Sequence, residues 1–153
     1  MPITQETSEA IPDIFVLPFT LEELHQRLDN TRGWQDKYRQ LMLLGRELPA
    51  LPDHYKTDAT RLTGCESTVW LHHYYDDQSM TLHFAADSDA RIIRGLAALV
   101  LAACSGQQPG NIAQVKLENW FRELNLFTHL SSSRGNGLRS IIGEIQTIAH
   151  RYH

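Results

Sequence analysis

Hydrophobic positions in the first third of the chain recur at helical spacing and predict two helices. The leucines between residues 21 and 28 lie on one helical face, and Thr20 and Glu23 have the spacing of a capping box. The first helix is therefore expected to begin after Thr20 and to end near Arg32–Gly33. A second helix, with Gly45 as its expected C-cap, is predicted by apolar residues at the i, i+4, i+7 and i+8 positions, which are Trp34, Tyr38, Leu41 and Met42.

The pattern then changes to one typical of β-strands. Two prolines in residues 48–53 can continue neither a helix nor a central strand, so this connection is expected to be extended. Residues 67–75 are rich in Thr, Val, Trp, His and Tyr, which favour a pleated surface. A turn at residues 76–79 leads into residues 80–85, and together these segments predict an antiparallel hairpin.

Helical periodicity returns in the second half of the chain. Residues 87–89 offer capping side chains and negative charge to the start of a helix that stays apolar through Leu101. Residues 105–111 interrupt this helix, and a short helical stretch is expected around residues 118–124. A final helix is expected after residues 131–133, and its apolar stripe consists of Leu138, Ile141, Ile142, Ile145, Ile148, Ala149 and Tyr152. The order of helices, hairpin and helices predicts an α+β fold.

The length of 153 residues fits one domain with its own core. We expect residues 1–18 to be a mobile N-terminal arm and residues 19–153 to form the domain, in which a hairpin or small antiparallel sheet packs against several helices. The N-terminus lacks the charged start and apolar stretch of a signal peptide. The longest apolar run, residues 96–104, is shorter than the roughly 20 residues that a membrane-spanning helix needs. We therefore expect a cytoplasmic protein without a membrane span.

Charge and metal-ligand patterns exclude several functional classes. Fourteen Lys and Arg against eighteen Asp and Glu give a net charge of −4, which argues against nucleic acid or an anionic membrane as the main partner. The adjacent His72 and His73 would point to opposite faces of a strand, so they cannot chelate one ion. Neither a CxxC nor an HExxH pattern is present, and no metal site is predicted.

The two cysteines, Cys65 and Cys104, differ in their surroundings. Two are too few for a disulfide framework or a typical iron–sulfur site. Cys104 ends the apolar run of a predicted buried helix and is expected to pack in the core. Cys65 follows Gly64 on a loop just before the first strand, where the glycine allows a sharp turn and leaves the sulfur unshielded. An inert buried thiol is the alternative at Cys65.

A small cysteine hydrolase is one interpretation of an exposed thiol. Cys65 with His83 or His129 and an aspartate could form such a site, because catalytic partners are neighbours in space rather than in sequence. No residue spacing in the sequence supports this arrangement.

Five blocks of sequence together resemble one known family. In chain order they are WQDKYRQL, LGRELPALPD, GCESTVW around Cys65, ADSDARIIRGLAAL and LSSSRGNGL. They resemble the SufE/CsdE family of sulfur acceptors for cysteine desulfurases, over about residues 19–148. The first two blocks, and the glutamate after the cysteine, are more similar to the CsdE branch than to SufE proper. The resemblance implies a SufE/NifU-like fold.

The resemblance also implies a relay mechanism in which Cys65 is the reactive residue. A desulfurase of the CsdA or SufS type would be stimulated and would donate sulfane sulfur, which then passes to a downstream acceptor protein for iron–sulfur cluster assembly or another sulfur-requiring pathway. No cofactor is expected on this chain, because pyridoxal phosphate belongs to the desulfurase. A monomer and a homodimer are both compatible with this role. A non-catalytic protein that activates the desulfurase only by docking stays an alternative, so enzyme status stays open.

Residues around the cysteine receive further roles. Glu66 stands beside Cys65, and its carboxylate is expected to raise the pKa of the thiol by like-charge repulsion. By resemblance, Arg134 lies near the cysteine loop and offers positive charge to a thiolate or persulfide. Asp87 and Asp89 are expected first at a helix start, and by resemblance also as contacts for the desulfurase. Asp89 could instead hold the cysteine loop.

Overall fold

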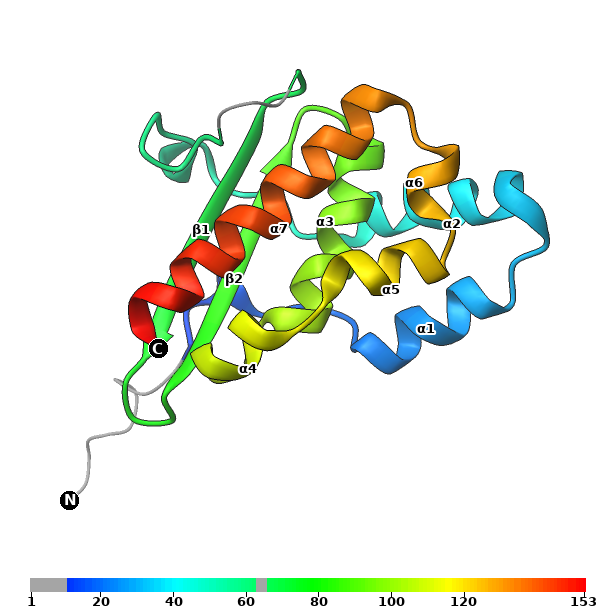
Figure 1. Ribbon diagram of the computed structural model, residues 1–153. Coiled ribbons are helices and arrows are strands. Elements are labelled where there is room, and N and C mark those ends of the chain that lie inside the picture. The colour runs from blue at the N-terminus through cyan, green and yellow to red at the C-terminus, as the bar shows by residue number, and fades with distance from the viewer. Residues whose placement is uncertain (1–10, 63–65) are drawn as a thin grey trace.

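A computed structural model of the chain describes residues 11–62 and 66–153 (Figure 1). The strands, β1 (Val69–Asp76) and β2 (Thr81–Ser88), form a two-stranded antiparallel sheet that stands between helices in the chain, so the α+β prediction is confirmed. The helices are α1 (Leu21–Asp29), α2 (Gly33–Glu47), α3 (Arg91–Cys104), α4 (Pro109–Gln114), α5 (Leu117–Glu123), α6 (Leu126–His129) and α7 (Ser132–Tyr152). Two short 3-10 turns, η2 (Asp13–Phe15) and η3 (Asp53–Tyr55), complete the described elements.

Strand β2 extends further than its sequence pattern predicted. Its register runs from Val69 opposite Ser88 to Asp76 opposite Thr81. Asp87 and Ser88 were expected to cap a helix but are the last residues of β2, because backbone pairing with β1 continues through them. Helix α3 accordingly begins at Arg91, and no side chain caps its N-terminus.

Helix α3 is the buried centre of the molecule and crosses α2 at very short distance. A Cβ atom built on Gly95 would lie 2.0 Å from the Leu41 carbonyl oxygen, and one built on Gly45 would lie 2.4 Å from the Arg91 carbonyl oxygen. The two glycines therefore let the helix backbones touch, with the end of α2 against the start of α3. Gly45 was expected to end α2, but the helix continues to Glu47 because this glycine serves packing rather than capping.

Side chains cap the first and the last α-helix, and the cap of the first was predicted. The Thr20–Glu23 capping box is present in both directions, at 3.1 and 2.8 Å. The Ser131 side chain accepts a hydrogen bond from the Arg134 amide at the start of α7. The α7 stripe from Leu138 to Ala149 is buried as predicted, while Tyr152 is 40% exposed and stacks on Tyr75 of β1. Figure 1 shows α7 crossing in front of α3 and the hairpin.

The packed part of the chain begins before residue 19, where the domain was expected to start. Phe15 is buried in a small cluster with Leu51 and Ala85, and its ring lies 5.8 Å from that of Tyr74. Residues 1–10 of the expected arm lie outside the described residues. Among the described residues, none of the helices combines the length and apolarity needed to cross a membrane.

Candidate functional site

The segment that carries Cys65 leaves and re-enters the fold at one end of the hairpin. Gly64 and Cys65 themselves lie outside the described residues, which resume at Glu66. Leu62, on the N-terminal side of the segment, donates its amide hydrogen to the Val69 carbonyl oxygen at 2.9 Å. At residues further along the chain from Cys65, the Leu71 amide donates to the Thr60 carbonyl oxygen at 2.8 Å. This backbone pairing brings the two sides of the segment together at the start of β1.

Thr68, three residues after Cys65, is fixed through both of its backbone polar groups. Its amide donates to a carboxylate oxygen of Asp89 at 3.1 Å, and its carbonyl oxygen accepts from the Asp89 amide at 3.3 Å. The Ser88 hydroxyl donates to the same carbonyl oxygen at 2.7 Å. We call these contacts the Thr68 clamp. Asp89 thus holds the residue three positions after Cys65, while its expected contact with the desulfurase stays a prediction.

Asp87 lies beneath the clamp in a buried polar network. Its side chain is 3% exposed, pairs with Arg94 and lies 3.4 Å from the Lys56 ammonium group. One carboxylate oxygen accepts from the Leu51 amide at 2.9 Å. Arg94 in turn donates to the carbonyl oxygens of Gly45, at 2.7 Å, and of Leu48. The network joins the end of β2, the 48–53 connection and the α2–α3 crossing, and direct partner contact by Asp87 stays a prediction.

Cys104 is packed away from any reaction partner. Its side chain is 0% exposed, and burial raises the pKa of its thiol to about 12. A thiol must be deprotonated to act as a nucleophile. The prediction that Cys104 is a core residue is confirmed, and Cys65 is the other cysteine of the chain.

The remaining predicted site residues lie in different surroundings. Glu66 is exposed at the point where the described chain resumes. The Arg134 guanidinium group lies over the Tyr38 ring, 5.6 Å from its centroid. Since Cys65 is not among the described residues, the predicted approach of Arg134 to the thiol stays a prediction.

The two histidines considered for a hydrolase are engaged elsewhere. His83 is opposite Tyr74, five positions along β2 from Ser88, which corresponds to about 16 Å of strand. Its Nε2 atom lies 2.9 Å from the Thr81 hydroxyl. His129 stacks on Trp34 with ring centroids 4.8 Å apart. The hydrolase interpretation therefore has no support from His83 or His129.

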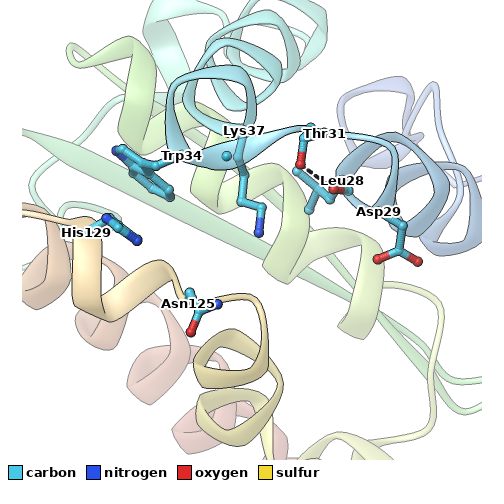
Figure 2. Close-up of a pocket in the computed structure, with 8 residues that line it drawn as sticks. Leu28, Asp29, Thr31, Trp34, Lys37, Asn125 and His129 are labelled. Carbon is cyan, nitrogen blue, oxygen red and sulfur yellow. Dashed lines mark hydrogen bonds between the residues drawn. The ribbon is translucent and has the colours of Figure 1, made fainter.

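His129 and Trp34 belong to a polar surface cavity of about 330 Å³ between α2 and the α5–α6 connection (Figure 2). Figure 2 shows Lys37 reaching into this cavity, where its ammonium group donates to the Leu124 carbonyl oxygen at 2.9 Å. Asn125, which also lines the cavity, takes a left-handed conformation with φ of 61°. These groups connect α2 to the α5–α6 region and do not adjoin the Thr68 clamp.

His72 and His73 are separated by the pleat of β1. His72 lies 2.9 Å from the Tyr55 carbonyl oxygen, whereas His73 lies 3.2 Å from the Tyr152 hydroxyl. The two side chains therefore point to opposite faces of the strand, as predicted. Within residues 11–62 and 66–153 no group of three potential ligands from His, Cys, Asp and Glu could hold a metal ion.

A second cavity, not predicted from the sequence, adjoins the Thr68 clamp. It has a volume of about 400 Å³ and is lined by Gly45, Arg46, Ser88, Asp89, Arg91 and Arg94. We call it the arginine cavity. Because Arg46 and Arg91 are far apart in the chain and meet only through the α2–α3 crossing, no local sequence signal could have identified it.

Comparison with known proteins agrees with this architecture. Residues 22–149 match the family model described as SufE, an Fe-S metabolism associated domain. The chain is 41% identical to the sulfur acceptor protein CsdE of Escherichia coli over 122 residues, covering 80% of this chain and 82% of that protein. It is 42% identical to an uncharacterized SufE-like protein of Rhizobium meliloti over 118 residues, covering 76% of this chain and 84% of that protein.

A solved structure extends the comparison to the fold. The solution structure of a hypothetical protein from Thermus thermophilus superposes with a TM-score of 0.68 at 14% identity, covering 90% of this chain and 98% of that one. At this identity the likeness concerns the fold alone. The family match spans most of the chain and agrees with the motifs around the cysteine, and the chain therefore belongs to the SufE family.

Proposed function

We propose that this protein is a sulfur acceptor that takes sulfane sulfur from a cysteine desulfurase onto Cys65 and passes it to a downstream acceptor. The single observation that carries the proposal is the separation of the two cysteines. Cys104 is enclosed in the core, with a thiol pKa of about 12, and leaves Cys65 as the sulfur available for exchange. Family membership and the similarity to a sulfur acceptor protein support the same role.

The surroundings of Cys65 suit a residue that must meet another protein. The Leu62–Val69 pairing and the Thr68 clamp fix both sides of its segment on the end of the hairpin. Reactive side chains in proteins are often carried by segments between rigid elements. The anchoring of these flanking residues supports the proposal that Cys65 meets its partner at this end of the hairpin.

The transfer step is a thiol exchange without net oxidation or reduction. The Cys65 thiolate attacks the outer sulfur of the desulfurase persulfide and forms a new sulfur–sulfur bond. The sulfur–sulfur bond of the donor breaks, and its electron pair leaves with the desulfurase cysteine as a thiolate. The proton on the outer sulfur stays with it, so the product is a persulfide on Cys65. Pyridoxal phosphate acts earlier, on the desulfurase, and this chain contributes only its thiol.

The Cys65 persulfide would then supply sulfur for iron–sulfur cluster assembly or another sulfur-requiring pathway. Removing the sulfur from the desulfurase frees its cysteine for the next turnover. Stimulation of the desulfurase is therefore expected from the chemistry itself.

Desulfurase stimulation in the presence of Cys65→Ser tests the proposal. Sulfide or alanine formation by a purified CsdA-type desulfurase is measured with free cysteine as substrate and with each variant added. The wild type and Cys104→Ala are expected to stimulate the enzyme equally, whereas Cys65→Ser is expected to lose stimulation. Full stimulation by Cys65→Ser would refute the relay and would favour a protein that activates the enzyme by docking alone.

A further inference from the structure

We infer that the arginine cavity binds carboxylate groups of the sulfur-donating protein, with Arg46 and Arg91 as the recognition residues. This inference rests on the proposed function, because it assigns a contact to the partner that the relay requires. The cavity shares Ser88 and Asp89 with the Thr68 clamp, so it opens beside the place where the Cys65 segment rejoins the fold.

Arg46 and Arg91 are brought together by the α2–α3 crossing. Gly45 approaches the Arg91 carbonyl so closely that no Cβ would fit, and Arg46 is the next residue along α2. Both arginine side chains are exposed. Within the described part of the chain, neither has an ion pair or a side-chain hydrogen bond.

The neighbouring charged groups already have partners of their own. Glu47, which follows Arg46, forms a bidentate pair with Arg27 at 2.8 and 2.9 Å. Arg94 pairs with Asp87 and with two backbone carbonyl groups. Asp89 is a negative group in the cavity wall, and one of its oxygens accepts from the Thr68 amide. Arg46 and Arg91 are therefore the positive groups of the cavity that have no acidic partner among the described residues, on a chain whose net charge is −4.

Carboxylates are the group that this arrangement suits best in a protein partner. A guanidinium group presents paired N–H donors that match the two oxygens of a carboxylate. The start of α3 adds to the attraction, since it lacks a side-chain cap and the positive end of the helix dipole lies there. Thr68, which bonds Asp89 in the cavity wall, is three residues from Cys65, so a partner that reaches Cys65 comes close to this cavity. Acidic side chains beside the donor cysteine would then fit the cavity.

Charge reversal tests the inference directly. The double variant Arg46→Glu/Arg91→Glu and the wild type are compared for binding to a purified CsdA-type desulfurase, measured by biolayer interferometry at about 0.05 and about 0.5 M salt. The wild type is expected to bind more weakly at high salt. The double variant is expected to bind about tenfold or more weakly at low salt and to lose most of the salt dependence.

A matched control carries the same change in charge at distant positions. Arg122→Glu/Arg151→Glu alters two exposed arginines on α5 and at the end of α7, and it is expected to bind within about twofold of the wild type. Reaction of Cys65 with neutral iodoacetamide in the absence of the desulfurase provides a partner-independent measure of the thiol. Any slowing of this reaction in the Arg46→Glu/Arg91→Glu variant, caused by the added carboxylates, is expected to be smaller than the loss of desulfurase binding.

The outcomes separate this inference from the proposed function. Equal desulfurase binding by the wild type and the Arg46→Glu/Arg91→Glu variant would overturn the inference. A wild type that binds the desulfurase through these arginines but takes up no sulfur would overturn the proposed function and uphold the inference. A wild type that does not bind the desulfurase would overturn both.

Discussion

At the residue scale, the Thr68 clamp links Asp89 to the chemistry of a cysteine three positions before Thr68. The Asp89 carboxylate and amide together satisfy both backbone groups of Thr68. A hydrogen bond to a charged acceptor contributes about 1.5–3 kcal/mol when buried and less when exposed, as here. The clamp is therefore expected to restrain Thr68 by no more than a few kcal/mol.

Removing the Asp89 carboxylate should make Cys65 easier to reach. Asp89→Ala is expected to speed alkylation of Cys65 by iodoacetamide about fivefold, which corresponds to about 1 kcal/mol of lost local stability. Mass spectrometry of the modified protein over time gives the rate. Asp89→Asn keeps an oxygen acceptor and is expected to alkylate at a rate between those of the wild type and Asp89→Ala. An Asp89→Ala rate equal to that of the wild type would contradict the role of the clamp.

Glu66 is expected to moderate the reactivity of the free thiol. A carboxylate next to Cys65 disfavours the thiolate, so we expect Cys65 in the free protein to alkylate at pH 6 no faster than a model thiol. Glu66→Gln should increase the alkylation rate about two- to threefold at neutral pH. A wild-type thiol that reacts far faster than the model compound at pH 6 would contradict this expectation.

At the element scale, sequence patterns predicted those elements whose signals are local. The Thr20–Glu23 capping box and the α7 stripe follow from spacing within one helix, and both are present. The extension of β2 to Ser88 depends on pairing with β1. The capping side chains at residues 87–89 therefore predicted a helix start where the strand in fact continues. The short helices α4 and α6 have too few residues for a periodic pattern and were not predicted.

The α2–α3 crossing gives a clear prediction about glycine. A methyl group on Gly95 would meet the Leu41 backbone at 2.0 Å, so Gly95→Ala is expected to lower the free energy of unfolding by about 3 kcal/mol or more. Gly143, in the middle of α7, has no atom within 4 Å of its Cβ position, and Gly143→Ala is expected to raise the free energy by about 0.5–1 kcal/mol. Urea denaturation measures both. A Gly95→Ala protein as stable as the wild type would show that the helices do not touch.

At the scale of the whole molecule, the candidate functional surface is assembled from distant parts of the chain. The Thr68 clamp, the Asp87 network and the arginine cavity join β1, β2, α2 and α3 at one end of the hairpin. The core position of Cys104 was predicted from local composition and is confirmed, whereas the predicted loop position of Cys65 lies outside the described residues. That Arg46 and Arg91 line one cavity could not be predicted from the sequence, because they come together only when α2 and α3 pack.

The stability of the whole fold should depend on pH through two histidines. Burial lowers the pKa of His73, with Arg151 adding to the effect, and burial also lowers the pKa of His83. The unfolded chain therefore binds more protons than the folded chain as the pH falls through about 6.5. The free energy of unfolding is expected to decrease between pH 7.5 and pH 5.5.

Urea denaturation across this pH range provides the measurement. His73→Gln/His83→Gln is expected to show a flatter dependence than the wild type, whereas the exposed His150→Gln should leave the slope unchanged. A wild-type stability that is constant or rises toward pH 5.5 would contradict the inferred environment of these histidines.

The central claim, that Cys65 alone accepts sulfur, is tested most directly by intact-protein and peptide mass spectrometry after incubation with free cysteine and a CsdA-type desulfurase. One added sulfur atom is expected on the peptide that contains Cys65, and the same addition is expected in Cys104→Ala. Treatment with a reducing thiol should remove it, because a persulfide is reversible by thiol exchange. Sulfur found on Cys104, or on neither cysteine while the desulfurase is active, would contradict this claim.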